Sequence, residues 1–420
     1  MLGAVSAHYV IQGGRPLEGD VTVSGSKNAA LYTLPAALLT SEPVTLRNVP
    51  RIADIREMAE LCESVGAQVE IEGETVRMVT PAVTSAAPPA DLVAKIRASF
   101  LLMGALLGRA GEAECAAPGG DVIGSRPLDV HFVGFRALGA QVERRGSAWR
   151  AAGGALTGAR IFFDYPSVLG TVNVLFAAVK ARGTSTIINA APEPEVEMLA
   201  NLLISMGARI SGHGTPVITV EGVEELHGTD FTVIPDRLEV GTYLLGAVAT
   251  HGDVRVTNAE PLHLDSLLAK LRDMNVTVQV DESGVRVRCP GELQAVQVQA
   301  VPYPGFATDL HPPMAAAMTQ AKGVSIVHER VYDNRTLYVN ELRKMGARIT
   351  TAADIVLIEG PTRLSGAGVR ALDIRAGAAV VVAALAADGE TTIGEVHHLD
   401  RGYADLQERL ASLGAQIERR

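Results

Sequence analysis

The feature that most constrains the fold is a short motif that recurs six times along the 420 residues. In five copies an amphipathic segment ends in Gly-Ala before residues of alternating polarity, and in the sixth an asparagine replaces the glycine. Glycine and asparagine readily adopt the left-handed conformation that closes a helix, so each marker is predicted to end an amphipathic helix before a short strand. The markers, separated by 73, 68, 68, 71 and 68 residues, are Gly66, Gly139, Gly207, Asn275, Gly346 and Gly414.

A second series of segments follows the same repeat and is apolar on nearly every side, which is typical of buried helices. The predicted buried helices are AALYTLPAALL, ASFLLMGALLG, TVNVLFAAVKA, VGTYLLGAVAT, HPPMAAAMTQA and AGAAVVVAALA. The predicted strands beside them include VTLRNV, STIINA, VRVTNA, SIVHER and TTIGEV. Hydrophobic residues make up 47 % of the chain and aromatic residues only 4 %, so the core is expected to be aliphatic.

Six such units predict an α/β protein of two domains, each with three units whose sheets surround a helical centre. A chain of this length is also too long for one ordinary core. We place the first domain at 22–234 and the second at 235–420, with residues 1–21 returning to the second. The glycine-rich stretch PGGDVIGSRP is expected to belong to a mobile loop over residues 115–127.

The overall composition favours a cytoplasmic protein that binds neither nucleic acid nor membrane. The net charge of −10 lacks the basic excess of a general nucleic-acid-binding protein. The cysteines Cys62, Cys115 and Cys289 are few and lack metal-ligand spacing, as expected in a reducing compartment. The N-terminus is unlike a signal peptide, and no apolar run reaches the roughly 18 residues needed to span a bilayer.

A polar residue stands at the start of each predicted buried helix. These residues are Lys27 with Asn28, Arg97, Ser167, Arg237, Asp309 and Arg375. A purely structural repeat would reuse one capping residue, whereas this one mixes cations with serine and aspartate. Helix N-termini carry a partial positive charge, so cations placed there are unfavourable unless an anion binds.

The amphipathic helices add further cations near their starts, at Arg51, Arg126, Arg335 and Arg401. If the N-termini in both domains face one cleft, these guanidinium groups form a site for phosphate and carboxylate groups. Taken singly, each residue also has a structural interpretation. A lone arginine can form a structural ion pair, Asp309 and Ser167 can act as N-caps, and Asp121 can be an exposed turn residue.

At these residues the chain resembles the UDP-N-acetylglucosamine 1-carboxyvinyltransferases, which catalyse the first committed step of peptidoglycan synthesis. The resemblance covers nearly the whole chain. The motifs that carry it are GGRPLEGDVTVSGSKNAAL, IRASFLLMGALL, PGGDVIGSRPLDVH, DYPSVLGT, PDRLEVGTYL, FATDLHPP, DNRTLYVNELRKMGA and HHLDRGYADL. It implies two inverse α/β domains, each with three βαβ-containing units, and phosphoenolpyruvate and UDP-N-acetylglucosamine as substrates. It implies no cofactor and no metal, and we expect a monomer.

The resemblance also implies roles for individual residues. The predicted catalytic residues are Lys27, Asp121, Asp309 and Arg401, with Asp309 as the base at the sugar 3′-hydroxyl and Asp121 as the acid toward C3 of the enol. The predicted phosphoenolpyruvate contacts come from Lys27, Arg126 and Arg401, with Asn28 orienting groups nearby. Arg97 is expected near the nucleotide-sugar and phosphate groups. The predicted nucleotide-sugar contacts come from Arg126, Pro127, Leu128, Asp129, Val130, Tyr165, Pro166, Ser167, Val168 and Val331, with Arg335 and Arg375 completing the cationic site.

The chain departs from the family pattern at three positions. Asp121 stands where most members carry the loop cysteine that fosfomycin alkylates, so fosfomycin resistance is expected. Val172 and Val240 replace an expected glutamate and threonine, and could alter the sugar pocket. Replacing Lys27 or Arg401 with alanine is expected to lose turnover while stability stays similar or rises, because like charges crowd the empty site.

Two other functions remain open on the sequence. The first is 3-phosphoshikimate 1-carboxyvinyltransferase, which shares the fold and the phosphoenolpyruvate chemistry. The second is a catalytically silent paralogue that binds a nucleotide sugar, a reading kept open by Val172 and Val240. The segments DYPSV and PGGDVIGSRP favour the nucleotide sugar over shikimate 3-phosphate.

Overall fold

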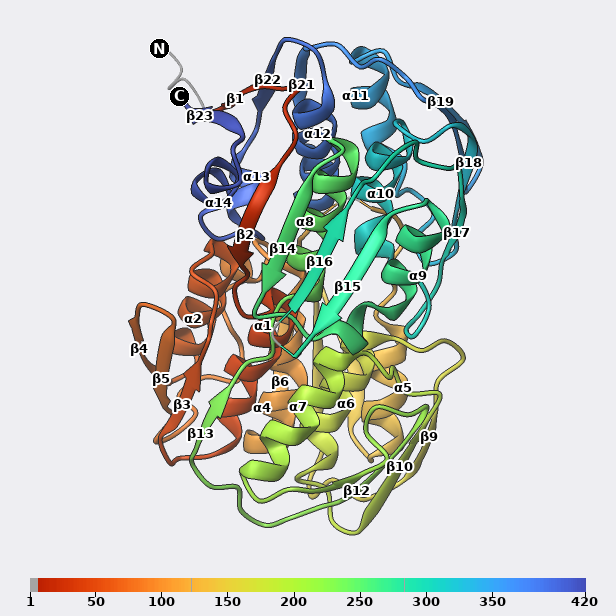
Figure 1. Cartoon of the computed structure of the whole chain (residues 1–420). Helices are drawn as coiled ribbons and strands as arrows, with labels where there is room; N and C mark the ends of the chain where they lie inside the picture. The colour runs from red at the N-terminus through yellow and green to blue at the C-terminus, as the bar shows by residue number, and fades with distance from the viewer. Residues whose placement is uncertain (1–6, 122, 283) are drawn as a thin grey trace. The chain divides into compact units, whose positions relative to one another are not determined.

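The computed structural model describes residues 7–121, 123–282 and 284–420, which form two compact units (Figure 1). We call Gly25–Asp121 with Arg126–Ile234 the first unit. The second unit consists of Met1–Ser24, Val122–Ser125 and Pro235–Arg420. Among the described residues, the helices are too short or too polar to cross a membrane.

The six predicted buried helices are confirmed, and nearly all of their side chains are inaccessible to solvent. Their Ala, Gly, Val and Leu side chains let neighbouring helices approach closely. For example, a Cβ atom on Gly104 would lie 2.1 Å from the carbonyl oxygen of Asn173. The helices are α1 (Lys27–Ala36), α4 (Leu102–Ala110), α6 (Val168–Ala178), α8 (Arg237–Ala249), α10 (His311–Met318) and α12 (Ile374–Ala386).

The amphipathic helices are also confirmed, and each ends just before its marker residue. All six markers have positive φ angles, from 68° at Asn275 to 117° at Gly66. This left-handed conformation turns the chain from the helix into the next strand, as the repeat predicted. The helices are α2 (Ala53–Ser64), α5 (Asp129–Ala137), α7 (Pro194–Ser205), α9 (Asp265–Asp273), α11 (Tyr338–Lys344) and α14 (Leu406–Ser412).

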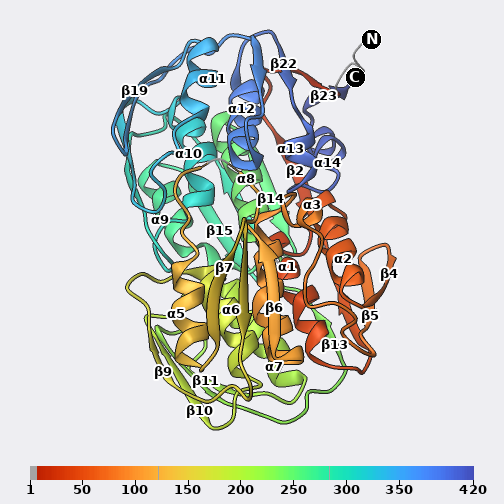
Figure 2. The ribbon, with the colours of Figure 1, turned by 180° about the vertical axis from the view of Figure 1, so that it is seen from behind.

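Three sheets flank the buried helices of the first unit; Figure 2 shows β6 and β7 in front of them. The first sheet has the order β13-β3-β5-β4, with strands Thr229–Thr232, Val44–Arg47, Thr75–Val79 and Gln68–Glu72. The second has the order β6-β8-β7, with strands Glu112–Ala116, Ala148–Ala152 and Gln141–Arg145. The third has the order β11-β12-β10-β9, with strands Arg209–Ser211, Val217–Glu221, Thr184–Ile188 and Arg160–Phe162.

The second unit likewise contains three sheets among its described residues. The first has the order β15-β16-β14-β2, with strands Thr277–Asp281, Gly284–Arg288, Asp253–Thr257 and Glu18–Thr22. The second has the order β17-β18-β20-β19, with strands Gln297–Ala300, Gly323–Glu329, Ile355–Gly360 and Arg348–Ala352. The third has the order β21-β22-β1-β23, with strands Gly368–Arg370, Glu390–Gly394, Tyr9–Gln12 and Gln416–Arg419.

Alternating side chains explain how each sheet covers its helices. In β14, Val254 and Val256 are buried and lie opposite Val287 and Val285 of β16 in an antiparallel ladder. Figure 1 shows this ladder in front of α8, which both strands contact. Strand β2 joins the other edge of β14 in parallel, so the N-terminal segment is part of the second unit. The period of two therefore directs one face of each strand into the aliphatic core.

In the second unit, the three central helices α8, α10 and α12 contact one another. The side chains that begin α10 and α12 also meet, since Arg375 of α12 bonds to Asp309 just before α10. The unit thus gathers the N-terminal ends of at least two buried helices at one place, where exposed N–H groups and helix dipoles favour bound anions.

Candidate active site

Short polar capping residues accept hydrogen bonds from the first N–H groups of four buried helices. The caps are Ser26, Ser167, Asp236 and Asp373, each of which accepts hydrogen bonds from N–H groups of the first helical turn. The repeat therefore does reuse short polar caps, contrary to the sequence-based argument. The cations Lys27, Arg237 and Arg375 occupy the first or second helical position just after the caps.

The two remaining buried helices begin with a different structure, which shows whether Asp309 acts as an N-cap. Short 3₁₀ turns, η2 (Arg97–Leu101) and η4 (Thr308–Leu310), precede α4 and α10. Asp309 is not the N-cap of its turn, and its carboxylate forms ion pairs with two arginines. The capping interpretation is therefore wrong for Asp309. For Ser167 it is confirmed, since its Oγ accepts from the Gly170 N–H at 3.1 Å.

Lys27 in the first unit forms a buried ion pair. Its Nζ lies 2.9 Å from Oδ2 of Asp54, and the two side chains are only 8 % and 4 % exposed. Asp54 is in the first turn of α2, three residues after Arg51, within the quoted segment PRIAD. Asp54 was not predicted from the sequence, because only Arg51 of that segment fitted the pattern of cations near helix starts. The pair holds an ammonium group at the start of α1 while the neighbouring Asn28 is half-buried.

Arg97, Asp121 and Arg126 lie together in the first unit. The Arg126 guanidinium donates to the backbone carbonyl of Asp121 at 2.5 Å, and the Arg97 guanidinium donates to the carbonyl of Arg126. Gly120 makes this approach possible, because a Cβ there would lie 2.9 Å from the Cβ of Arg97 and its φ is +103°. The structure therefore brings two predicted cations to the backbone that carries Asp121.

The predicted loop 115–127 begins within a strand, because β6 extends to Ala116. Further along, Ser125 and Ile123 belong to the second unit. There the Ser125 N–H donates to Oδ1 of Asp333 at 3.0 Å, and the Asn334 N–H donates to the carbonyl of Ile123 at 3.3 Å. These bonds hold Ile123 and Ser125 against Asp333 and Asn334.

The two predicted nucleotide-sugar segments meet in the first unit. Residues 127–130 form the turn into α5, where Leu128 is the N-cap residue and Asp129 the first helical residue. Residues 165–168 lead into α6, and the Tyr165 side chain is exposed. A Cβ on Gly170 would lie only 2.7 Å from Cγ1 of Val130, so the starts of α5 and α6 are in direct contact.

A buried asparagine connects these segments to the Arg97 turn. The Nδ2 of Asn173 donates to the carbonyl of Phe100 at 2.8 Å and contacts Nδ1 of His131 at 2.9 Å, while its Oδ1 accepts from the Gly104 N–H. Burial, assisted by Arg97, lowers the pKa of His131 to about 3, so the ring is neutral and Nδ1 accepts the amide proton. Asn173 therefore ties η2 to the start of α5.

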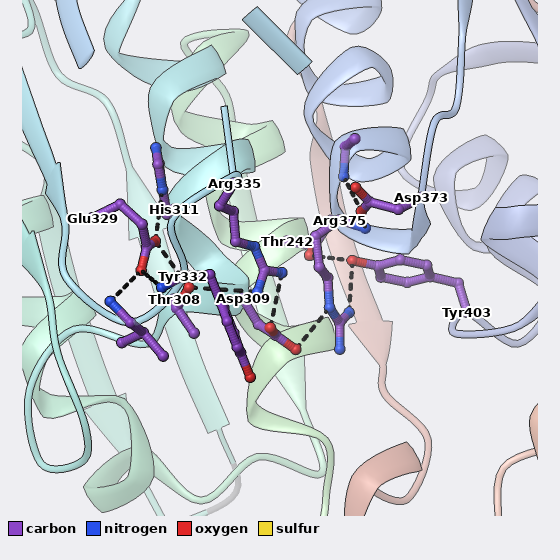
Figure 3. Close-up of polar contacts among 12 residues, drawn as sticks. Thr242, Thr308, Asp309, His311, Glu329, Tyr332, Arg335, Asp373, Arg375 and Tyr403 are labelled. Carbon is purple, nitrogen blue, oxygen red and sulfur yellow. Dashed lines mark hydrogen bonds and ion pairs between the residues drawn. The ribbon is translucent and has the colours of Figure 1, made fainter. Parts of the chain in front are cut away.

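In the second unit, Asp309 is held between two guanidinium groups (Figure 3). Its Oδ1 lies 2.9 Å from Nη2 of Arg335, and its Oδ2 lies 3.1 Å from Nε of Arg375. The arginine side chains are almost fully buried, whereas the Asp309 side chain is 25 % exposed. Two adjacent positive charges favour the ionised carboxylate. The arrangement therefore presents an oriented carboxylate that is partly accessible to solvent.

Arg375 is oriented by a second buried contact. Its Nη1 donates to the hydroxyl of Tyr403 at 3.1 Å, and that hydroxyl lies 2.9 Å from Oγ1 of Thr242. Burial disfavours the charge, but Tyr403, Asp309 and Asp236 together hold the pKa of Arg375 above its usual value. Tyr403 lies in the quoted segment HHLDRGYADL, where only the arginine was singled out.

The remaining predicted residues have varied surroundings. Arg401 is the C-cap residue of α13 (His397–Asp400), two positions before Tyr403. The Val331 N–H donates to Oε1 of Glu329 at 2.9 Å. Val172 and Val240, two of the three predicted departures from the family pattern, are fully buried in α6 and α8. Within the part of the chain that the structure describes, no three His, Cys, Asp or Glu side chains are grouped to hold a metal ion.

The Tyr403 contact leads to a first prediction. Replacing Tyr403 with phenylalanine keeps the ring beside Arg375 but removes the hydroxyl that joins Arg375 to Thr242. Unfolding free energy should fall by about 1–3 kcal/mol, because the buried Arg375 guanidinium loses an acceptor and the Thr242 hydroxyl, which donates to the Leu238 carbonyl, loses a donor. Turnover should fall by about 10-fold or more as Arg375 becomes free to turn away from Asp309. Thermal unfolding and steady-state kinetics test this, and a variant with wild-type turnover would contradict it.

Comparison with known proteins places this chain in a family. The sequence family described as EPSP synthase (3-phosphoshikimate 1-carboxyvinyltransferase) matches residues 11–410. The chain is 48 % identical over 414 residues to UDP-N-acetylglucosamine 1-carboxyvinyltransferase 2 of Carboxydothermus hydrogenoformans, covering 98 % of this chain and 99 % of the relative. It is 46 % identical over 413 residues to the UDP-N-acetylglucosamine 1-carboxyvinyltransferase of Solibacter usitatus, with the same coverage.

Solved structures agree on the fold. The enolpyruvyl transferase NikO from Streptomyces tendae superposes with a TM-score of 0.88 at 29 % identity, covering 99 % of each chain. The EPSP synthase from Acinetobacter baumannii gives a TM-score of 0.78 at 18 % identity, covering 99 % of this chain and 100 % of the other. The predicted enolpyruvyl transferase fold is thereby confirmed. The chain belongs to the EPSP synthase family and, within it, to the UDP-N-acetylglucosamine 1-carboxyvinyltransferases.

Proposed function

We propose that this protein transfers the enolpyruvyl group of phosphoenolpyruvate to the 3′-hydroxyl of UDP-N-acetylglucosamine and releases phosphate, the first committed step of peptidoglycan synthesis. The observation that carries the proposal is the Asp309 carboxylate held between Arg335 and Arg375. It occurs in a chain that is 44–48 % identical, over 98 % of its length, to relatives named for this reaction.

The reaction begins with attack of the sugar hydroxyl on C2 of phosphoenolpyruvate. Asp309 accepts the hydroxyl proton as the new C–O bond forms, and Asp121 supplies the proton that C3 gains. The tetrahedral intermediate then loses phosphate, and the Asp121 carboxylate takes back a proton from the methyl group, which restores the double bond. The ionised form of Asp309 suits a base, whereas Asp121 can act as the acid only when it is protonated.

The cations hold the groups whose charge changes during the reaction. Lys27, Arg126 and Arg401 would bind the phosphate and carboxylate of phosphoenolpyruvate, with Asn28 orienting groups nearby and Arg97 lying near the nucleotide-sugar and phosphate groups. Ammonium and guanidinium groups that are held by fixed partners stabilise developing charge without reorganising. The contacts of Lys27 with Asp54 and of Arg126 with the Asp121 carbonyl support such a role.

The nucleotide sugar would bind along the two segments that meet in the first unit. Arg126, Pro127, Leu128, Asp129 and Val130 would form one wall. Tyr165, Pro166, Ser167 and Val168 would form the other, with Val331 also touching the nucleotide. The exposed Tyr165 ring beside a helix N-terminus suits a ligand that has both a planar base and phosphate groups.

Phosphate release with phosphoenolpyruvate and UDP-N-acetylglucosamine tests the proposal. The alternative acceptor is shikimate 3-phosphate, which the description of the matching family favours. Calorimetric titration with each acceptor separates the two activities and detects a silent paralogue that binds the sugar without turnover. No phosphate release with either acceptor would refute both enzymatic functions.

Location and assembly belong to the same proposal. The enzyme would act in the cytoplasm as a monomer, without a cofactor, nucleic acid or membrane as partner. The free thiols of Cys62, Cys115 and Cys289 are in keeping with a reducing compartment. Cell fractionation and analytical ultracentrifugation test these points, and a stable dimer would contradict the second.

A further inference from the structure

We propose that Glu329 is a positioning residue, whose single carboxylate holds both the turn that carries Asp309 and the segment that begins at Val331. Glu329 ends strand β18 and is buried. It was not among the residues expected from the sequence, and we assign it neither the role of the base nor a contact with substrate. The inference rests on the proposed function, because it concerns how that site is kept in order.

One carboxylate oxygen holds the turn around Asp309. Oε2 of Glu329 accepts a hydrogen bond from Oγ1 of Thr308 at 2.8 Å and lies 2.9 Å from Nδ1 of His311 (Figure 3). Thr308 precedes Asp309, and His311 follows it by two residues. Thr308 Oγ1 also accepts from Nη1 of Arg335 at 3.4 Å, so the same turn is tied to the arginine that pairs with Asp309.

The other oxygen holds the backbone that leads to Arg335. Oε1 of Glu329 accepts from the N–H groups of Val331 at 2.9 Å and Tyr332 at 3.2 Å. The Tyr332 ring in turn lies beneath the Arg335 guanidinium, whose carbon is 5.5 Å from the ring centroid. Glu329 therefore fixes both the predicted nucleotide contact at Val331 and the chain that presents Arg335.

An ionised Glu329 and a neutral His311 are consistent with the four hydrogen bonds that Glu329 accepts. Burial would raise the pKa of Glu329, but hydrogen bonds from His311, Val331 and Thr308 outweigh it and lower that pKa. Burial lowers the pKa of His311, so its ring is neutral. Because a carboxylate can only accept, Nδ1 of His311 carries the proton and Nε2 accepts from the Tyr338 hydroxyl at 2.8 Å.

A neutral side chain cannot reproduce this arrangement. Four donors point at the two oxygens of Glu329, whereas an amide has one oxygen that accepts and one nitrogen that donates. Glutamine at this position can keep the two hydrogen bonds to one oxygen only. The two donors that face its NH₂ group lose their acceptor. The fold offers a matched control in Glu341, a buried carboxylate of the same unit that accepts from Lys344 and the Arg370 N–H.

Steady-state kinetics with four variants tests the inference. Glu329→Gln should lower kcat about 100-fold and raise KM for UDP-N-acetylglucosamine about 10-fold, since a displacement of about 1 Å costs that much. Thr308→Val removes the contacts of Thr308 with Glu329 and Arg335 but leaves the Val331 and Tyr332 contacts of Glu329 in place, so kcat should fall about 10-fold while KM changes less than about 2-fold. Glu329→Asp keeps the negative charge, so its kcat should be higher than that of Glu329→Gln but lower than that of the wild type. Glu341→Gln should lose stability but keep kcat and KM.

The outcomes separate this inference from the proposed function. A wild-type protein that releases no phosphate with UDP-N-acetylglucosamine refutes the proposed function. If the wild type turns over and Glu329→Gln behaves like Glu341→Gln, only the role of Glu329 is overturned. If Glu329→Gln does not fold, the kinetics of Thr308→Val and Glu329→Asp test the role of Glu329 instead. Wild-type kcat and KM in both variants would overturn the inference.

Discussion

Replacing Lys27 with alanine is expected to remove most turnover and to lower the free energy of unfolding by about 3–5 kcal/mol. Turnover falls because an ammonium group aimed at the migrating phosphate is lost. Stability falls because Asp54, which is almost fully buried 2.9 Å from the ammonium, would lose the cation that offsets the burial of its carboxyl group. The sequence alone led to the opposite expectation for stability, since it revealed the crowding of cations but not the carboxylate beside Lys27.

A double-mutant cycle separates the two effects. Removing Asp54 together with Lys27 should recover part of the stability, because no charge is left unpaired, but none of the turnover. Lys95→Ala is the matched control, since Lys95 pairs with Glu57 and Glu60 at the surface of the same unit and should cost less than about 1 kcal/mol. Near-normal activity in Lys27→Ala would show that Lys27 does not act on the phosphate.

The second large effect is expected with fosfomycin, which should not inactivate the wild-type protein. The sequence resemblance predicts that Asp121 stands at the loop position where most of the family carries the reactive cysteine, and a carboxylate is a far poorer nucleophile than a thiolate. The chain's own cysteines offer no substitute. Burial raises the pKa of Cys115 to about 12 and that of Cys289 to about 11, and raises that of Cys62 further. All three thiols are therefore protonated at neutral pH.

Asp121→Cys should remain active and become sensitive to fosfomycin in a time-dependent manner. Asp121→Asn should bind the nucleotide sugar but lose turnover, because an amide cannot donate the proton that C3 needs. Adding Cys115→Ala to Asp121→Cys is the control, and it should leave the sensitivity unchanged. Mass spectrometry locates any adduct. An adduct on the wild-type loop, or full activity in Asp121→Asn, would contradict the role assigned to Asp121.

The repeat determined the fold from the sequence alone. Six marker residues, each followed by an alternating segment, predicted helix ends that all have positive φ angles in the structure. Apolar composition on every side likewise identified α1, α4, α6, α8, α10 and α12 as buried. These features are local, because helix closure and burial depend on residues within a few positions of one another.

The partners of the site residues were decided only by the tertiary structure. Asp309 is 66 positions from Arg375 in the sequence, and Phe100 is 73 from Asn173, yet each pair is joined by a hydrogen bond. Periodicity reports which face of an element is buried, but not which side chain of another element meets it there. That choice arises when helices and sheets pack at close range, where a buried polar group must find a partner or cost free energy. For this reason the sequence indicated the cations and Asp309, whereas Asp54, Tyr403 and Glu329 emerged only from the packed structure.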